Sequence, residues 1–257
     1  MRAEGRCAVV TGGASGLGAA AVTKLAAEGA RVVVSDRDLD AASSLARTLD
    51  ASGQRVKAVR CDISNAQDIT DLVRDAEAFF GQPVDLFLAN AGAGFSGSLL
   101  DATPEQLRRT IDINVTGSLL SAQAALRSLV KARNGSLIFT CSLQGVTARA
   151  QRSAYTASKH AIVGMVKALA LEFGPQGVRV NAIAPAATDT PFLRHQLAGV
   201  TTDVEAAMKA TERSLPLGRL PDTEDFAEAV MYLSSAQAKS ITGHTLLIDC
   251  GASAGKL

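Results

Sequence analysis

A tyrosine and a lysine four positions apart are the residues of this sequence best suited to proton transfer. Tyr155 is one of only two tyrosines in the chain, and Lys159 follows it within the segment SAYTASKHA. If this segment is helical, four residues make about one turn, so the phenol and the ammonium emerge on the same face. A free phenol ionises only near pH ~10, but a positive charge beside it favours the phenolate. The pair therefore predicts a tyrosine whose proton is available for transfer.

A second candidate site is the glycine-rich segment VVTGGASGLG. It follows an apolar segment that resembles a strand and opens a helical segment, which is the context of a phosphate-binding turn. Gly12, Gly16 and Gly18 allow a tight turn, close approach of a pyrophosphate and close packing of the helix. The amino terminus of that helix adds unpaired N–H groups and the positive end of a dipole. The segment therefore predicts a dinucleotide site.

An acidic residue after the glycine turn indicates which dinucleotide is bound. Asp36 ends the second strand-like segment, where a carboxylate accepts hydrogen bonds from the adenosine ribose hydroxyls and repels a 2′-phosphate. The neighbouring Arg37 is able to stack on adenine or to pair with a phosphate. Because the acid occupies the ribose position itself, we expect NAD, with NADP as the less favoured cofactor.

Short β-branched segments alternate with longer segments of helical periodicity along the whole chain. Several of the short segments are apolar on both faces, as are parallel strands covered by helices on each side. The alternation predicts an α/β fold, a single doubly wound (Rossmann-type) domain over residues 1–257 with a seven-stranded parallel sheet and helices on both faces. The expected strands are CAVVTG from Cys7, RVVVSD from Arg31, RVKAVRCD from Arg55, VDLFLAN from Val84, GSLIFTCS from Gly135, VRVNAIAP from Val178 and TLLID from Thr245.

Two further segments carry helix-start signals. Thr103 and Gln106 in TPEQ predict a capping box. Within about residues 186–220, a connection of unusual length, TDVEAAMKATERS predicts an amphipathic helix with Thr202 and Glu205 as its capping box. An insertion of this kind at the carboxyl end of a sheet predicts a helical lid over a substrate, with a surface excursion of no function as the alternative.

Composition excludes several classes of partner. The formal net charge is +1 and no block of like charges occurs, so we expect neither nucleic acid nor an anionic membrane as partner. No apolar run reaches membrane-spanning length and no secretory segment precedes Arg6, which predicts a cytoplasmic protein. We expect the cysteines to be buried and reduced, and no metal site, because the three histidines have no ligand spacing. The cysteines are Cys7, Cys61, Cys141 and Cys250.

Together these motifs resemble those of the short-chain dehydrogenase/reductase family, in its single-domain branch of about this length. The resemblance extends from Arg6 to about Ala252. The family's motifs appear as Thr-Gly-x-x-x-Gly-x-Gly at Thr11 to Gly18, Asn-Ala-Gly at Asn90 to Gly92 and Tyr-x-x-x-Lys at Tyr155 to Lys159. Asn114 in DINVTG and Ser142, thirteen positions before the tyrosine, match further family positions.

The resemblance implies roles for individual residues. Tyr155 becomes the general base when a secondary alcohol is oxidised and the general acid when a ketone is reduced. Ser142 would donate to the substrate oxygen, Lys159 would also hold the nicotinamide ribose, and Asn114 would hold a water that links Lys159 to bulk solvent. The expected catalytic residues are thus Asn114, Ser142, Tyr155 and Lys159, and the expected substrate-binding residues are Ser142, Gln144 and Tyr155. The expected cofactor-binding residues are Gly12, Ser15, Gly16, Leu17, Gly18, Asp36, Arg37, Asp62, Ile63, Asn90, Ala91, Gly92, Tyr155, Lys159, Pro185, Thr188 and Thr190.

One segment departs from the family pattern. The usual Pro-Gly after the sixth strand is Pro185-Ala186 here, although Thr190 still aligns with a threonine that typically binds the nicotinamide carboxamide. Thr188 stands where a small aliphatic residue is common. If the backbone needs a positive φ at position 186, alanine costs about 1 kcal/mol or sends the start of the lid along another path.

The function predicted from these residues is an NAD-dependent oxidoreductase acting on a secondary alcohol or its ketone. One alternative is an NADPH-dependent 3-oxoacyl-thioester reductase, against which Asp36 counts. The other is a catalytically silent dinucleotide-binding sensor, which would have no reason to keep the complete catalytic set. Arg149 and Arg152 lie between Ser142 and Tyr155, and either is able to pair with a substrate carboxylate, but we expect ordinary solvated arginines.

The resemblance also implies a homotetramer. Family members usually pair through the two long helices that here begin near Thr103 and Arg152, with a second interface near the last strand. The segments GSLLSAQAALRSLV and SKHAIVGMVKALALEF carry more apolar and small residues than one core-facing stripe needs. This excess is the sequence support for a second buried face.

Overall fold

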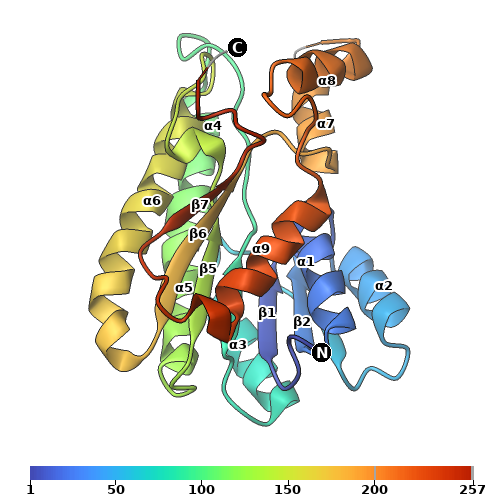
Figure 1. Ribbon diagram of the computed structural model, residues 1–257, viewed down its shortest axis with the longest axis vertical. Helices are drawn as coiled ribbons and strands as arrows, with labels where there is room; N and C mark the ends of the chain where they lie inside the picture. Colours follow the sequence, from blue (N-terminus) through green and yellow to red (C-terminus); the bar gives the residue numbers. More distant parts are fainter. Residues whose placement is uncertain (200, 256–257) are drawn as a thin grey trace.

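A seven-stranded parallel sheet forms the centre of the computed structural model, which describes residues 1–199 and 201–255 (Figure 1). The strand order is β3-β2-β1-β4-β5-β6-β7, and every neighbouring pair is parallel. The strands are β1 (Cys7–Thr11), β2 (Arg31–Asp36), β3 (Val56–Arg60), β4 (Leu86–Ala89), β5 (Ser136–Thr140), β6 (Arg179–Pro185) and β7 (Thr245–Ile248). The predicted doubly wound α/β fold is confirmed.

Helices cover both faces of the sheet, and the inner strands, such as β1 and β4, are buried and apolar on both sides. Ala8 and Val10 of β1 pack in the same cluster as α1, α2 and α9, whereas Cys7 and Val9 pack in the cluster of α3, α5 and α6. Adjacent residues of one strand thus serve opposite layers, as the pleat requires. The helices are α1 (Gly16–Ala27), α2 (Leu39–Leu49) and α9 (Thr223–Ser234) on one face, and α3 (Ala66–Phe80), α5 (Gly117–Leu129) and α6 (Ser153–Phe173) on the other.

The strand order reverses direction between β1 and β4. From β1 the chain builds outward to β2 and β3, and then returns to continue outward from β4 on the other side. The connections that leave the carboxyl ends of β1 and β4 therefore diverge to opposite faces, and a crevice forms between them. This crevice is where the glycine turn after β1 and the Asn90 segment after β4 meet.

The helix on which Asn114 lies is not a regular α-helix. It begins as α4 (Pro104–Ile111), passes through a π-helical turn, η1 (Asp112–Thr116), and continues as α5. At its start the predicted capping box is present, since Thr103 Oγ1 accepts from the Gln106 N–H at 3.3 Å and Gln106 Oε1 accepts from the Thr103 N–H at 2.9 Å. Single π-turns inside α-helices often lie at functional sites.

Residues 186–220 hold two helices, α7 (Pro191–Ala198) and α8 (Val204–Arg213), which stand together at the top of Figure 1. The predicted amphipathic helix is α8, but its predicted capping box is wrong. Asp203 is the N-cap, and its carboxylate accepts from the Ala206 N–H at 2.9 Å. The helix therefore begins one residue later than a Thr202 cap requires, which puts Glu205 out of register. Leu197 and Met208 pack with Leu215, Leu220 and Cys250 in a small cluster of their own.

Three short 3₁₀ turns complete the described chain, at η2 (Leu143–Gly145), η3 (Gly174–Gln176) and η4 (Ala236–Ala238). All four cysteines are buried and free, as predicted. Burial raises the pKa of Cys61 to about 12, which keeps its thiol protonated and unreactive. Among residues 1–199 and 201–255, no helix is long and apolar enough to cross a bilayer, and no group of three or more His, Cys, Asp or Glu side chains is placed to hold a metal.

Candidate active site

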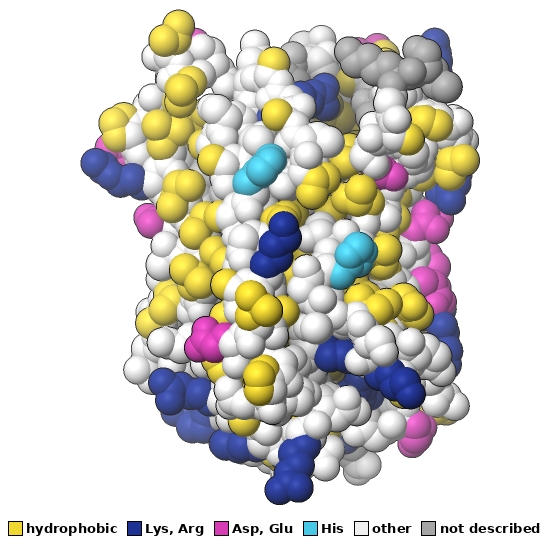
Figure 2. All heavy atoms as spheres, turned by 60° about the vertical axis from the view of Figure 1, so that its left-hand side comes forward, with side chains coloured by type: hydrophobic (Ala, Val, Ile, Leu, Met, Phe, Trp, Pro, Cys, Tyr) yellow, Lys and Arg dark blue, Asp and Glu magenta, His cyan; other side chains and the backbone are white. Residues whose placement is uncertain are grey.

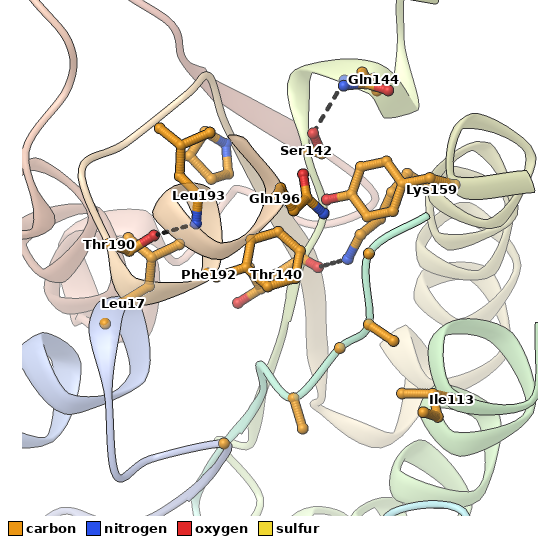
Figure 3. A pocket seen from close by; sticks show the side chains of 18 of the residues that line it. Leu17, Ile113, Thr140, Ser142, Gln144, Lys159, Thr190, Phe192, Leu193 and Gln196 are labelled. Atoms are coloured by element: carbon orange, nitrogen blue, oxygen red, sulfur yellow. Dashed lines mark hydrogen bonds between the residues drawn. The ribbon is translucent and has the colours of Figure 1, made fainter. Parts of the chain in front are cut away.

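A cleft of about 1300 Å³ opens at the carboxyl ends of the strands, where the strand order reverses. The residues predicted to bind cofactor or substrate or to take part in catalysis line this cleft, except for Gly18 and Asn114, which lie behind its wall. Figure 3 shows Leu17 and Thr190 on one side of the cleft and Ser142 and Lys159 on the other. The fold thus brings together residues that are as much as 178 positions apart in the sequence, between Gly12 and Thr190.

The glycine turn has the geometry of an anion cradle. Gly12 and Gly16 have φ values of 61° and 52°, which side-chain-bearing residues rarely adopt. A Cβ on Gly18 would lie 2.0 Å from the Gly12 carbonyl oxygen, so α1 packs on the turn only because position 18 is glycine. Ser15 is the N-cap of α1, yet its side chain makes no capping hydrogen bond within the described chain. The first N–H groups of α1 are therefore available to a phosphate, and the turn fits a dinucleotide.

The end of β2 fixes a carboxylate beside this turn. Asp36 Oδ2 accepts from the Ala14 N–H at 3.2 Å, and its Oδ1 accepts from the Asp38 N–H at 3.1 Å. Asp36 is half-buried, whereas the following Arg37 is exposed. One of these donors, Ala14, belongs to the glycine turn itself, so the carboxylate is held directly beside that turn.

Asn90 joins the carboxyl ends of three strands. Its Nδ2 donates to the carbonyl oxygens of Thr11 and Gly12, both at 3.0 Å, and its Oδ1 accepts from the Thr140 hydroxyl at 3.0 Å. All polar atoms of this carboxamide are therefore used within the protein. Its contribution is to fix the backbone of residues 90–92 against the glycine turn.

The adenine side of the predicted site is held by the segment after β3. Asp62 Oδ1 accepts from the hydroxyl and the N–H of Ser64 at 2.7 and 2.9 Å, and these bonds, the hydroxyl first, hold the pKa of Asp62 below its usual value. Ile63 packs against the first turn of α5, since a Cβ on Gly117 would lie 2.9 Å from the Ile63 carbonyl oxygen. Both residues line the cleft.

Tyr155 and Lys159 lie on the same buried face of α6, as their spacing predicts. Their side chains are 8% and 6% exposed, respectively, and both line the cleft. Lys159 Nζ lies 5.7 Å from the centre of the Tyr155 ring and donates to the Thr140 carbonyl oxygen at 2.9 Å (Figure 3). Ser142 follows β5, and its Oγ accepts from the Gln144 N–H at 3.2 Å. A phenol, an ammonium and a hydroxyl thus gather at one end of the cleft.

Asn114 supports this group from behind. Its Oδ1 accepts from the Ala93 N–H at 2.7 Å, and its Nδ2 donates to the Ala93 carbonyl oxygen at 2.8 Å and to Ser158 Oγ at 3.0 Å. The carboxamide ties the segment after β4 to α6. It makes no hydrogen bond to Lys159 within the described chain, although a Cβ on Gly92 would lie 3.3 Å from Asn114 Oδ1 and 3.8 Å from Lys159 Nζ. The water-holding role that the resemblance implies for Asn114 stays a prediction.

The segment after β6 tolerates its departure from the family pattern. In the described ranges, the non-glycine residues with positive φ are Arg133, Gln151 and Cys250. Ala186 therefore has an ordinary φ, its N–H donates to the Ile248 carbonyl oxygen at 2.9 Å, and the penalty considered for it does not arise. Its predicted neighbour Thr188 lines the cleft and donates its hydroxyl to the Ala186 carbonyl oxygen at 3.2 Å.

Thr190 has a local task that the sequence analysis missed. Its Oγ1 accepts from the Leu193 N–H at 3.3 Å, so it is the N-cap of α7, and Pro191 occupies the first helical position. A threonine followed by proline is a helix-start signal, and it would have predicted α7. The same helix brings Phe192 and Gln196 into the cleft, and neither was a predicted site residue.

The two arginines near Tyr155 differ, and the expectation that both are solvated is wrong for one. Arg149 is exposed, but Arg152 is only 7% exposed. Its guanidinium turns inward because Nη1 donates to the Phe95 carbonyl oxygen at 3.2 Å and to Gln196 Oε1. Burial, followed by the charge of Arg149, holds the pKa of Arg152 below its usual value.

Comparisons with known proteins agree with this geometry. A family model described as enoyl-(acyl carrier protein) reductase matches residues 12–253. The chain is 37% identical over 247 residues to cis-4-hydroxycyclohexanecarboxylate dehydrogenase of Sinomonas cyclohexanicum, covering 96% of each chain. It is also 37% identical to 2,5-dichloro-2,5-cyclohexadiene-1,4-diol dehydrogenase of Sphingobium indicum, covering 99% of this chain and 98% of the relative.

A solved structure gives the same result at the level of the fold. The 3-ketoacyl-(acyl-carrier-protein) reductase of Brucella melitensis, complexed with NADH, matches with a TM-score of 0.86 and 32% identity, covering 97% of this chain and 99% of that one. The chain belongs to the short-chain dehydrogenase/reductase family, as its motifs predicted. It is an oxidoreductase of alcohols and ketones that uses a nicotinamide dinucleotide.

Proposed function

We propose that this enzyme interconverts a secondary alcohol and its ketone with NAD as the cofactor, and that Tyr155 transfers the hydroxyl proton. The observation that carries the proposal is the buried pair of Tyr155 and Lys159 on one face of α6, with Ser142 at the same end of a cleft that begins at a glycine turn. A protein that only sensed a dinucleotide would need the turn but not this group.

Each of the three side chains has a distinct task in the proposed reaction. The Ser142 hydroxyl donates to the substrate oxygen and orients it toward Tyr155. In the oxidation direction Tyr155 accepts the proton of that oxygen, and in reduction it returns the proton. The Lys159 ammonium stabilises the negative charge that develops on the Tyr155 oxygen during proton transfer, because it lies 5.7 Å from the ring centre in a buried site, where charges are weakly screened. The bound dinucleotide supplies the hydride acceptor.

The preference for NAD rests on Asp36. Its carboxylate is fixed by the Ala14 and Asp38 N–H groups beside the phosphate turn, and a fixed negative charge there opposes a 2′-phosphate. The neighbouring Arg37 is exposed, so its guanidinium is not fixed beside the turn as the Asp36 carboxylate is. The Brucella structure was determined with NADH, which supports the same preference.

The proposed substrate carries its hydroxyl on a ring. The two relatives at 37% identity are named for a hydroxycyclohexane and a cyclohexadienediol. We infer that residues 186–220 form a lid over such a ring, since Phe192 and Gln196 of α7 already line the cleft. Enclosing the substrate excludes water from the proton-transfer group.

The proposed assembly is a homotetramer. Leu119 of α5 and Leu171 of α6 are 47% and 81% exposed, and the edge strand β7 is only half-buried. Figure 2 brings the α6 side forward and shows hydrophobic side chains scattered across it, with most charged side chains near its edges. Light scattering at micromolar protein should give four times the monomer mass, and a monomer would contradict the proposal.

A second candidate function is reduction of a 3-oxoacyl thioester. The similarity to the Brucella reductase favours it, and the catalytic side chains would be the same. The two candidate functions therefore differ only in the carbonyl compound that is reduced, and an assay of both substrate classes distinguishes them.

The test is a screen of cyclic and open-chain secondary alcohols with NAD⁺ and NADP⁺, read from the absorbance of the reduced cofactor. An acetoacetyl thioester with NADH is the comparison substrate, and the Tyr155→Phe variant is the control for background reduction. We expect turnover of a cyclic alcohol with NAD⁺ and none in the variant. Faster turnover of the thioester would favour the second candidate, and cofactor binding without any turnover would favour the sensor.

A further inference from the structure

The buried guanidinium of Arg152 lacks a counter-ion within the described chain. Its two hydrogen bonds both come from Nη1 and both go to neutral acceptors, the Phe95 carbonyl oxygen and Gln196 Oε1. No carboxylate of residues 1–199 and 201–255 forms an ion pair with Arg152 or with Arg149. Buried charges are normally paired, so this cation needs a reason to be there.

A second buried arginine shows what a purely structural role looks like. Arg179 is buried as well, at 9% exposed. Its two terminal nitrogens, however, donate to three carbonyl oxygens, those of Leu233, Ser235 and Ile241. These bonds satisfy the carboxyl end of α9 and the turn that follows it. Arg152 leaves Nη2 and Nε without a partner in the described chain, so most of its donor fork is unused.

The groups around Arg152 are positively charged or lie at the positive end of a helix dipole, so none of them neutralises the guanidinium. Arg152 is the N-cap residue of α6, a position that usually holds Ser, Thr, Asp or Asn, and its side chain makes no capping bond. The helix amino terminus is itself the positive end of a dipole. Arg149 lies three residues earlier, and Gln151, with a φ of 60°, turns the chain directly before Arg152. An anion in this corner would be stabilised by the helix dipole and by Arg152, whereas the exposed Arg149 adds only a charge that solvent screens.

A second unused donor lies beside the guanidinium. Gln196 Oε1 accepts from Arg152, whereas its buried Nε2 has no hydrogen-bond partner among the described residues. Figure 3 shows Gln196, which comes from α7, reaching across the cleft toward the side that holds Ser142 and Lys159. Arg152 and Gln196 both line the cleft. The free donors of Arg152 therefore border the space where the substrate must lie, whereas Gln196 Nε2 is packed against Gly94 and Gln196 acts on the guanidinium through Oε1.

We propose that Arg152, oriented by its hydrogen bond to Gln196 Oε1, binds a carboxylate of the substrate, so that the enzyme acts on a hydroxy acid and the matching keto acid. The inference rests on the proposed function, because it assigns the far end of the same substrate. A carboxylate suits this corner because arginine offers parallel N–H donors that match its two oxygens. The hydroxyl of the same molecule is left to meet Ser142 and Tyr155.

Binding without turnover is the first test. Cyclohexanecarboxylate and its neutral counterpart cyclohexanecarboxamide are titrated by calorimetry into the enzyme saturated with NAD⁺. We expect the carboxylate to bind about 10- to 100-fold more tightly, the range of a charge-assisted pair of hydrogen bonds. Equal affinities in the wild-type enzyme would overturn the inference, whatever any variant does.

Variants then assign the preference to Arg152. Arg152→Met should remove the preference for the carboxylate and change carboxamide binding by less than about threefold, and Arg152→Lys should keep part of the preference. Arg149→Met is the matched control, since it removes an exposed arginine from the same segment, and it should keep the preference. A preference that survives in Arg152→Met, or that is lost in Arg149→Met, would overturn the assignment to Arg152.

Turnover separates this inference from the proposed function. For 4-hydroxycyclohexanecarboxylate and its carboxamide, Arg152→Met should raise KM for the acid alone by about 10-fold or more and leave kcat for both within about threefold. Turnover of neutral alcohols without any advantage for the acid would overturn the inference and leave the proposed function intact. Selective carboxylate binding without turnover of any alcohol would overturn the proposed function and leave the anion site intact.

Discussion

The two ends of the cleft differ in whether backbone or side-chain groups form them. The dinucleotide end is made of backbone, with Gly12 and Gly16 at positive φ and Gly18 packed against a carbonyl oxygen. The substrate end is made of side chains that come from separate elements, such as Tyr155 from α6 and Gln196 from α7. A backbone site tolerates few residue types and leaves a signature in the local sequence, whereas a side-chain site depends on which elements meet. The difference explains why the cofactor is easier to infer than the substrate.

The largest effect should come from removing one oxygen at the substrate end. Tyr155→Phe keeps the ring that packs in the cleft and loses only the transferable proton, so kcat should fall by about 10²- to 10⁴-fold. NAD binding, followed by fluorescence, should change by less than about twofold, because the glycine turn is untouched. A variant that lost cofactor affinity in step with kcat would show that the two ends are not separable.

Lys159→Met should have the next largest effect, a fall in kcat of about 10²-fold. The ammonium stabilises the negative charge that forms on the Tyr155 oxygen as its proton is transferred, and methionine removes that stabilisation. Lys159→Arg should restore part of the rate, since the charge returns on a bulkier group that cannot keep the 2.9 Å bond to the Thr140 carbonyl oxygen in the same form. A Lys159→Met variant with the wild-type kcat would refute the charge argument.

Asp36→Asn tests the charged side chain on which the proposed preference for NAD rests. The amide keeps the shape of the carboxylate and an acceptor for the Ala14 N–H, but it no longer repels a 2′-phosphate. The ratio of kcat/KM for NADP⁺ to that for NAD⁺ should rise by about 10- to 100-fold, or ~1.4 to 2.8 kcal/mol. Asp62→Asn is the matched control, because this second acid of the cleft is engaged by Ser64, and it should leave the ratio within about threefold.

The sequence predicted the fold and the position of the glycine turn at the cleft, because local rules decide both. Apolar runs of strand length specify a buried parallel sheet, and glycines at fixed offsets after a strand specify the turn. The Tyr155 and Lys159 face also followed from helical spacing alone. Errors appeared at element boundaries, where Asp203 displaced Thr202 as a cap because two acceptors competed for the same helix start.

The sequence could not predict the substrate end, because tertiary contacts decide it. The sequence predicted an ordinary solvated arginine at position 152. Arg152 is buried because its guanidinium binds Phe95 and Gln196, which are 57 and 44 positions away in the sequence. No local pattern encodes that meeting. The Thr190-Pro191 signal for α7 was present, but it predicts a helix and does not say that Gln196 of this helix reaches the cleft.

The smallest predicted effect concerns Ala186, where the two ends of the cleft join after β6. Ala186→Gly should lower the free energy of unfolding by about 0.4 to 1 kcal/mol, because glycine gains freedom in the unfolded chain and the native φ suits alanine. Gly16→Ala is the comparison, since a φ of 52° strains an alanine in the native state instead. It should destabilise by more and also weaken NAD binding, whereas Ala186→Gly should leave NAD binding unchanged. Urea unfolding of both variants measures the difference, and a stabilised Ala186→Gly protein would mean that the alanine is strained after all, as a positive φ at that position would require.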